Sequence, residues 1–170
     1  VLATVRDITE RRRREEELRL LQEMTQAVSE SEDFQSAVET ALGKVCGATG
    51  WLLGEVWVPS SDGTRLERSP TWYSSIKDLE KFRKATEGIT FPRGVGLPGR
   101  VWASKQQAWI RDVTLDPNFP RAPMAREVGL KAGVGIPVLA NDEVVAVMDF
   151  FVREAREEDE RLVELISAIA

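Results

Sequence analysis

The chain has 170 residues, of which 42% are apolar and 30% are charged, and its net charge at pH 7 is −5. This length allows one domain of ordinary size plus an appendage, with a sizeable apolar core. The negative charge argues against nucleic acid or an anionic membrane as a partner, since both require a concentrated basic surface. A single cysteine excludes an internal disulfide, and the lack of histidine removes the commonest metal ligand and general base. We therefore predict no metal site and no catalytic residue.

Hydropathy along the chain indicates neither a membrane span nor a signal peptide. No apolar run approaches the roughly 20 residues that a spanning helix requires. The first residues also lack the charged and apolar regions of a secretory signal. A cytoplasmic location without membrane insertion is therefore predicted.

The chain opens on residues 1–9, VLATVRDIT, which alternate like the end of a strand, and continues into a helical run over residues 10–30. Because such an isolated strand has nothing to pair with, we expect the chain to belong to a longer protein. Apolar residues of the helical run follow spacings of three, four and three, which is the a/d seam of a parallel coiled coil. They are Leu18, Leu21, Thr25 and Val28. The alternative is that they pack on their own domain.

The C-terminal residues repeat this pattern in a helix that follows the acidic segment REEDE. Acidic residues suit the start of a helix because they complement its dipole. We predict that the two terminal helices lie side by side and pair with those of a second copy, as a homodimer. The C-terminal contribution would come from Leu162, Leu165, Ile166 and Ile169.

Between these ends, a second helix is predicted from Ser31 or Asp33 through FQSAVETALGKVCG. Cys46 ends its apolar stripe, a position more typical of a small core residue than of a reactive thiol. Two strands follow, WLLGEVWVP and RLERSPTWY, and the Asp-Gly turn between them is a strong hairpin signal. Residues 76–86 then predict a short amphipathic helix.

Residues 91–119 are rich in glycine and proline, and they predict a shaped loop, one helical turn and a short strand at 108–113. A short helix, PMAREVG, and the strands KAGVGIPVL and EVVAVMDFFV complete the chain. This order predicts an α+β fold with a central antiparallel sheet of five or six strands. Helices, including the terminal ones, would cover one face, and loops with short helices would cover the other, where a cavity would form.

The segment F-x-x-G-x-G-L-x-G-x-V-W, followed in order by W-I-x-D-V, D-x-x-F-x-R and G-I-P-V, resembles the GAF family, the small-molecule-sensing modules of bacterial signalling proteins. The resemblance covers roughly Ser31 to Ala170. The opening V-R-D-I-T-E-R resembles the exit of a PAS domain into a signalling helix. Together they imply a PAS remnant at 1–9, a signalling coiled-coil helix at 10–30 and a GAF domain at 31–170. An output domain would follow, as in a sensor histidine kinase or a cyclic-dinucleotide enzyme.

Two carboxylates stand out because they lie inside apolar strands. Burial of Glu55 or Asp149 is costly unless each is paired. Arginines of the loop layer are the candidate partners, namely Arg93, Arg100, Arg111 and Arg121. Such pairs would either fasten the loop layer to the sheet or present charge to a ligand.

The family resemblance places a ligand between the sheet and the loop layer. The candidate pocket then comprises Glu55, Trp57, Trp72, Trp102, Trp109, Arg111, Phe119, Met124 and Asp149. The alternative for the aromatic members is simple packing of the loop layer.

These observations predict a non-catalytic regulatory module that binds a small ligand or relays a signal through its helical dimer interface. No cofactor is predicted: Cys46 lies in an early helix and histidine is absent, which argues against a covalent bilin and against histidine-ligated haem. The Asn118-Phe119 pair lacks the Asp-Glu that follows in cyclic-nucleotide-binding members. A ligand-free dimerisation spacer is one alternative. Reduction of free methionine sulfoxide is another, but it requires a resolving thiol that the sequence lacks.

Overall fold

A computed structural model of the chain describes residues 8–15 and 32–169. In this part of the chain a five-stranded sheet is formed by β1 (Leu53–Pro59), β2 (Leu66–Ser74), β3 (Ala108–Ile110), β4 (Ala132–Ala140) and β5 (Glu143–Val152). The spatial order is β2-β1-β5-β4-β3, and every neighbouring pair is antiparallel. The predicted α+β fold with a central antiparallel sheet is confirmed.

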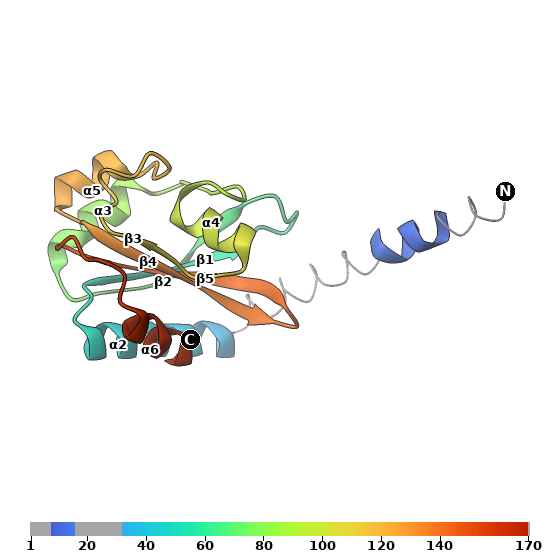
Figure 1. Cartoon of the computed structure of the whole chain (residues 1–170), viewed down its shortest axis with the longest axis horizontal. Helices are drawn as coiled ribbons and strands as arrows, with labels where there is room; N and C mark the ends of the chain where they lie inside the picture. The colour runs from blue at the N-terminus through green and yellow to red at the C-terminus, as the bar shows by residue number, and fades with distance from the viewer. Residues whose placement is uncertain (1–7, 16–31, 170) are drawn as a thin grey trace.

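Two helices cover one face of the sheet, α2 (Glu32–Thr49) and α6 (Glu160–Ile169) (Figure 1). The sequence of α2 places Val38, Leu42 and Val45 on one side at spacings of four and three, and all three are buried against the sheet. Cys46 is buried on the same side, with 4% of its surface exposed. The predicted core position of Cys46 is therefore correct.

The opposite face carries the loop layer, which we define as residues 75–131 without β3. It contains the 3-10 helix η1 (Lys77–Leu79) and the helices α3 (Glu80–Ala85), α4 (Gly96–Ser104) and α5 (Ala122–Val128) (Figure 1). The glycine-rich stretch is more helical than the single turn predicted after it, because α4 already begins at Gly96. Pro98 does not prevent this, since it falls in the first turn, where backbone N–H groups have no partner within the helix.

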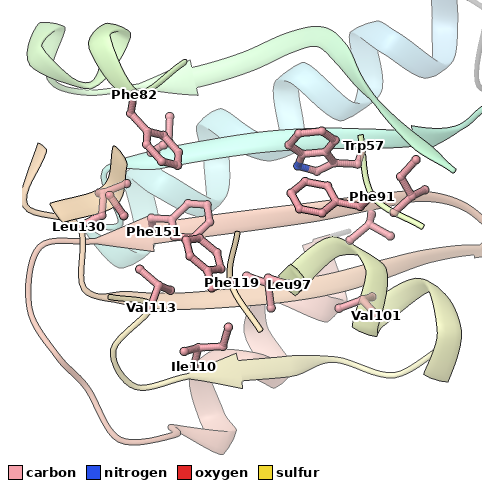
Figure 2. Packing of buried hydrophobic residues seen from close by; sticks show 14 of the residues in the cluster. Trp57, Phe82, Phe91, Leu97, Val101, Ile110, Val113, Phe119, Leu130 and Phe151 are labelled. Atoms are coloured by element: carbon pink, nitrogen blue, oxygen red, sulfur yellow. The ribbon is translucent and has the colours of Figure 1, made fainter. Parts of the chain in front are cut away.

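The sheet separates two apolar cores. The core on the helix side includes Val56, Ala146, Met148 and Phe150, while Leu53, Trp57, Val147 and Phe151 belong to the core under the loop layer. Figure 2 shows the second core, with Trp57 and Phe151 labelled. Side chains along β1 and β5 thus alternate between the two cores. Trp51, which precedes β1, packs on the helix side, where its ring meets that of Trp109 edge to face at 5.5 Å.

Residues 8–15 are helical, so Ile8 and Thr9 belong to a helix and not to the strand end predicted for them. The predicted seam residues Leu18, Leu21, Thr25 and Val28 lie outside the described residues. In α6, Leu162 is half-buried against the core on the helix side. The side chains of Leu165, Ile166 and Ile169 lie outside the described part. No helix in the described ranges is long and apolar enough to cross a membrane.

Candidate functional site

A fully buried arginine joins the loop layer to the two central strands. Arg121 lies immediately before α5, and its Nη1 donates to Oε1 of Glu55 on β1 at 2.8 Å. Its Nη2 donates to Oδ2 of Asp149 on β5 at 3.0 Å. Glu55 and Asp149 are direct partners in the β1–β5 register, so their side chains stand next to each other on one face. All three side chains are 0% exposed, and together they form what we call the Arg121 cluster.

Aromatic rings enclose the same guanidinium. The Arg121 Cζ lies 5.1–5.4 Å from the centroids of five rings, which come from β1, α3, β5 and two loop segments. Figure 2 labels the five residues that carry these rings. The face of an aromatic ring attracts a cation at such distances. We call these rings the aromatic cage; they belong to Trp57, Phe82, Phe91, Phe119 and Phe151. Trp57 also donates from Nε1 to Oδ2 of Asp149 at 3.1 Å.

Two buried carboxylates share one buried guanidinium, and this sets the charge of the cluster. Burial opposes the charge of Arg121, but Glu55 and Asp149 outweigh it and raise the pKa of the guanidinium. Burial, together with the negative charge of Glu55, raises the pKa of Asp149 to about 8, against the opposing effect of Arg121. The two pKa shifts are consistent with each other. When the pair of carboxyl groups holds one proton, it carries one negative charge, which balances the positive charge of the guanidinium.

Two further arginines approach Glu55 from the edge of the sheet. Nη1 of Arg68 on β2 and Nη1 of Arg83 on α3 lie 3.8 and 3.9 Å from its Oε2. These separations are too long for hydrogen bonds. Burial and the neighbouring charge of Arg68 lower the pKa of Arg83. Among the described residues, neither Oε2 of Glu55 nor Nη1 of Arg83 has a hydrogen-bond partner.

Arg68 and Arg83 also line a cleft between β2 and α3. The cleft has a volume of about 450 Å³, and its far wall is the loop of residues 87–90. A neighbouring hollow of about 300 Å³ shares both arginines and adds Trp72, whose ring lies 4.7 Å from the Arg83 guanidinium. Arg68 donates to the carbonyl of Arg83 at 2.8 Å, and Arg83 donates to the carbonyl of Ser69 at 3.3 Å. The two arginines therefore join the walls of the cleft by hydrogen bonds. Their guanidinium groups also lie between the cleft and Glu55.

The segment before Arg121 is held in place by polar contacts to the glycine-rich stretch. The amide oxygen of Asn118 accepts from the N–H of Gly96 at 3.0 Å, and its Nδ2 donates to the carbonyl of Gly94 at 2.9 Å. Arg100 of α4 pairs with Asp116 and donates to the carbonyl of Asn118 at 2.7 Å. These bonds fix the turn that directs Arg121 into the sheet.

The structure gathers most of the predicted pocket residues on the loop-layer side. Glu55, Trp57, Phe119 and Asp149 meet around Arg121, while Met124 packs at the periphery of the same core. Trp72 lines the hollow beside the cleft. Trp102 packs in the loop-layer core under the guanidinium of Arg93, 3.8 Å from its ring.

Two of the predicted pocket residues lie elsewhere. Trp109 packs on the helix side and donates to the carbonyl of Arg156 at 2.8 Å. Arg111 is 61% exposed and pairs with Glu157 at 2.6 Å. Of the four arginines considered as partners for the buried carboxylates, Arg121 is the one that pairs with both.

Sequence reasoning missed Arg68 and Arg83. A signal for Arg68 was available, because positions 57 and 68 are equally distant from the Asp62-Gly63 turn and should pair across the hairpin. The structure has this pairing of Trp57 with Arg68, which puts Arg68 on the same face as Glu55. Arg83 had none, since a six-residue helix does not specify which side faces a strand.

The described residues offer little for metal or thiol chemistry. They contain no group of three side chains that could hold a metal ion. Burial raises the pKa of the Cys46 thiol to about 12, so that it stays protonated at neutral pH. Cys46 also lies on the helix side of the sheet, across from the Arg121 cluster.

Comparison with known proteins agrees with the fold. A solved GAF domain from a phosphoenolpyruvate-protein phosphotransferase of Coxiella burnetii is similar to 89% of this chain and to 89% of its own length, with a TM-score of 0.62 and 18% identity. A free methionine-R-sulfoxide reductase from Neisseria meningitidis, solved with its substrate, is similar over 85% of this chain and 82% of its own, with a TM-score of 0.59 and 15% identity. At such identities the likeness concerns the fold alone.

In sequence, the chain is similar to Protein NLP3 of Arabidopsis thaliana, with 29% identity over 143 residues. The match covers 73% of this chain, which spans about a fifth (19%) of that relative. Residues 31–170 match the family profile described as GAF domain. The chain therefore belongs to the GAF domain family.

Proposed function

We propose that this chain is a non-catalytic regulatory domain of a multidomain cytoplasmic signalling protein, and that it relays changes in the loop layer to its terminal helices. The observation that carries the proposal is the Arg121 cluster, which links α5 to both central strands through two buried ion pairs. A displacement of α5 must break or move these pairs. A conformational change in the loop layer would thus alter the positions of β1 and β5.

The route from the sheet to α6 supports this relay. The segment between β5 and α6 is hydrogen-bonded both to the loop layer and to the sheet. Nε of Arg153 donates to the carbonyl of Val128 in α5 at 3.1 Å, and the carbonyl of Arg156 accepts from Trp109 of β3. Movement of α5 would therefore act on the segment that leads into α6.

We further propose that α6 and the helical run of residues 10–30 form a homodimer interface. A PAS domain would precede this helix and an output domain would follow α6, as in sensor histidine kinases or cyclic-dinucleotide enzymes. The short coverage of Protein NLP3 is consistent with a domain that works inside a longer chain.

Sedimentation of the chain tests the dimer. Charges at Leu165→Glu and Ile169→Glu would face each other across a helical seam, so this double variant should sediment as a monomer at concentrations where the unchanged chain is a dimer. Glu164→Ala, an exposed position on the same helix, is the matched control and should remain dimeric. A monomer for the unchanged chain at high micromolar concentration would count against the interface.

A small ligand would enter the cleft between β2 and α3, where Arg68, Arg83 and Trp72 offer charge and an aromatic face. A thermal-shift screen of nucleotides, amino acids, tetrapyrroles and aromatic acids tests this role. A ligand at 100 times its dissociation constant stabilises the folded state by about 2.7 kcal/mol. Arg68→Ala should remove that response. If the domain is a ligand-free dimerisation spacer, none of these compounds will change the melting temperature.

The likeness to a methionine-R-sulfoxide reductase gives a second candidate. It is the weaker one, because the sequence has a single cysteine and that thiol is buried on the helix side. An assay with free methionine sulfoxide and a thiol reductant decides between the two. Turnover that Cys46→Ser abolishes would establish the enzyme in place of the regulatory domain.

A further inference from the structure

The surroundings of the Arg121 guanidinium are those of a bound ligand. Its two Nη atoms each reach a different carboxylate, at 2.8 and 3.0 Å, and five rings enclose it. Carboxylates bind a guanidinium through its planar fork of donors, and aromatic cages are a general means of recognising cations. Strands β1 and β5 provide both carboxylates and two of the rings. The sheet therefore supplies both carboxylates, while the loop layer supplies the other three rings and the arginine itself.

Three polar atoms of the Arg121 cluster, two acceptors and one donor, make no hydrogen bond. In the part of the chain that the structure describes, Oδ1 of Asp149, Oε2 of Glu55 and Nε of Arg121 have no hydrogen-bond partner. Oε2 of Glu55 still faces the guanidinium groups of Arg68 and Arg83 at 3.8 and 3.9 Å, so its charge is paired although it accepts no hydrogen bond. Buried ion pairs in general are no more stabilising than apolar residues of the same volume. Recognition of a cation explains this arrangement better than packing does.

We propose that the sheet, the aromatic cage and the two carboxylates form a guanidinium-binding site, and that Arg121 occupies it as a ligand tethered to the chain. Glu55 and Asp149 are its recognition residues. A tethered group competes at an effective concentration on the order of millimolar or higher. The unchanged chain therefore does not bind free guanidinium compounds at this site, and the site becomes available only when the Arg121 side chain leaves it. This inference does not depend on the signalling role proposed above.

The site is tested by removing the Arg121 side chain and supplying a free guanidinium compound in its place. Arg121→Ala removes the side chain beyond Cβ, and ethylguanidinium restores the missing atoms. We expect the variant to melt about 10 °C below the unchanged chain, because two carboxylates are left buried without their cation. Millimolar ethylguanidinium should raise its melting temperature in a saturable manner. n-Butylammonium, which has the same charge but lacks the fork, should not.

Two controls make the result specific. Guanidinium compounds destabilise proteins in general, so both the unchanged chain and Arg93→Ala should melt at slightly lower temperature in ethylguanidinium. Arg93 is a suitable match because it also lies over an aromatic ring, that of Trp102, but takes part in no carboxylate pair among the described residues. Adding Glu55→Gln and Asp149→Asn to Arg121→Ala should abolish the rescue.

If Arg121→Ala does not fold alone, ethylguanidinium should restore its folding on dilution from urea, measured by far-ultraviolet circular dichroism. The proposal is overturned if ethylguanidinium and n-butylammonium act alike on Arg121→Ala, or if the triple variant responds as well as the single one. It is also overturned if neither compound stabilises or refolds the single variant.

Discussion

Asp149 makes the stability of the fold depend on pH. Burial and the charge of Glu55 raise the pKa of Asp149 to about 8, so the folded protein binds this proton more tightly than the unfolded chain does. The resulting stabilisation is fully present below the unfolded pKa of about 3.9 and is lost as the pH rises. We predict that the contribution of Asp149 to the free energy of unfolding decreases between about pH 4 and pH 8.

Urea denaturation of the unchanged chain and of Asp149→Asn across this range measures that contribution. The amide keeps an oxygen that can accept from Arg121 and Trp57, but it does not titrate. The difference between the two free energies of unfolding should therefore change by at least about 1.4 kcal/mol, which corresponds to a tenfold change in proton affinity. Parallel curves for the two proteins would show that Asp149 is ionised in the folded state at all these pH values.

Trp57 contributes a hydrogen bond as well as a ring. Its Nε1 donates to Asp149 in a fully buried position. Trp57→Phe keeps an aromatic ring in the cage but leaves that acceptor with one partner fewer, so we expect a loss of about 1–3 kcal/mol in the free energy of unfolding. Trp72→Phe is the control, because Trp72 is half-buried and no hydrogen bond involves its ring nitrogen in the described structure. Equal losses in the two variants would contradict a role for the hydrogen bond.

The need for partners at Glu55 and Asp149 could be predicted from the sequence, because both interrupt apolar strands. The identity of the partner could not. Arg93, Arg100, Arg111 and Arg121 all lie in the loop layer or its short strand, and the sequence does not specify which one the turns direct inward. That choice depends on the contacts of Asn118 with Gly94 and Gly96, which join segments more than 20 residues apart.

At the scale of elements, α4 depends on a glycine in its first turns. A Cβ on Gly99 would lie 2.4 Å from the carbonyl oxygen of Pro92, a backbone atom that cannot move aside easily. Gly99→Ala should therefore destabilise the protein by about 2 kcal/mol or more. The loss is measured by urea denaturation.

Gly47 provides a matched control for this substitution. It is also a helical glycine, in α2, but it is exposed and a Cβ there would meet no atom within 4 Å. Alanine has the higher helix propensity, so Gly47→Ala should stabilise the protein by about 0.5–1 kcal/mol. Opposite signs for the two Gly→Ala substitutions would locate the effect in the close approach of Pro92. A loss in both would indicate instead that alanine is tolerated in neither helix.

The elements that the sequence predicted well are those with a local signal. The Asp62-Gly63 turn lies between β1 and β2 as expected, and Gly63 has the positive φ of 70° that such a turn requires. The prediction that Trp109 lines the pocket was wrong. Because β3 is only three residues long, its sequence does not indicate which face of the sheet each residue occupies. Its register is set by pairing with β4, where Trp109 lies opposite Val134 on the helix side.

At the scale of the whole molecule, the sheet divides the domain into two cores of different character. The core under the loop layer contains the Arg121 cluster, whereas the core on the helix side, as far as its residues are described, contains no buried charged side chain. Cys46 belongs to the latter and is covered by α2 and the sheet. We therefore expect its thiol to react only after α2 has moved away from the sheet.

Cys46 therefore reports on the opening of the helix layer. Burial raises its pKa to about 12, which leaves about one molecule in ten thousand as thiolate at pH 8 even before access is considered. We predict that a disulfide reagent labels native Cys46 at least about a thousandfold more slowly than it labels the unfolded chain. The rate should increase with urea as the open state becomes populated.

The matched control moves the single cysteine to a solvent-exposed position. A Cys46→Ser, Ser61→Cys variant carries its one cysteine in the exposed turn after β1, and it should react at nearly the unfolded rate with little dependence on urea. If native Cys46 reacts as fast as this control, α2 is detached from the sheet in much of the population. The terminal helices would then be free of the sheet through which we propose that they receive their signal.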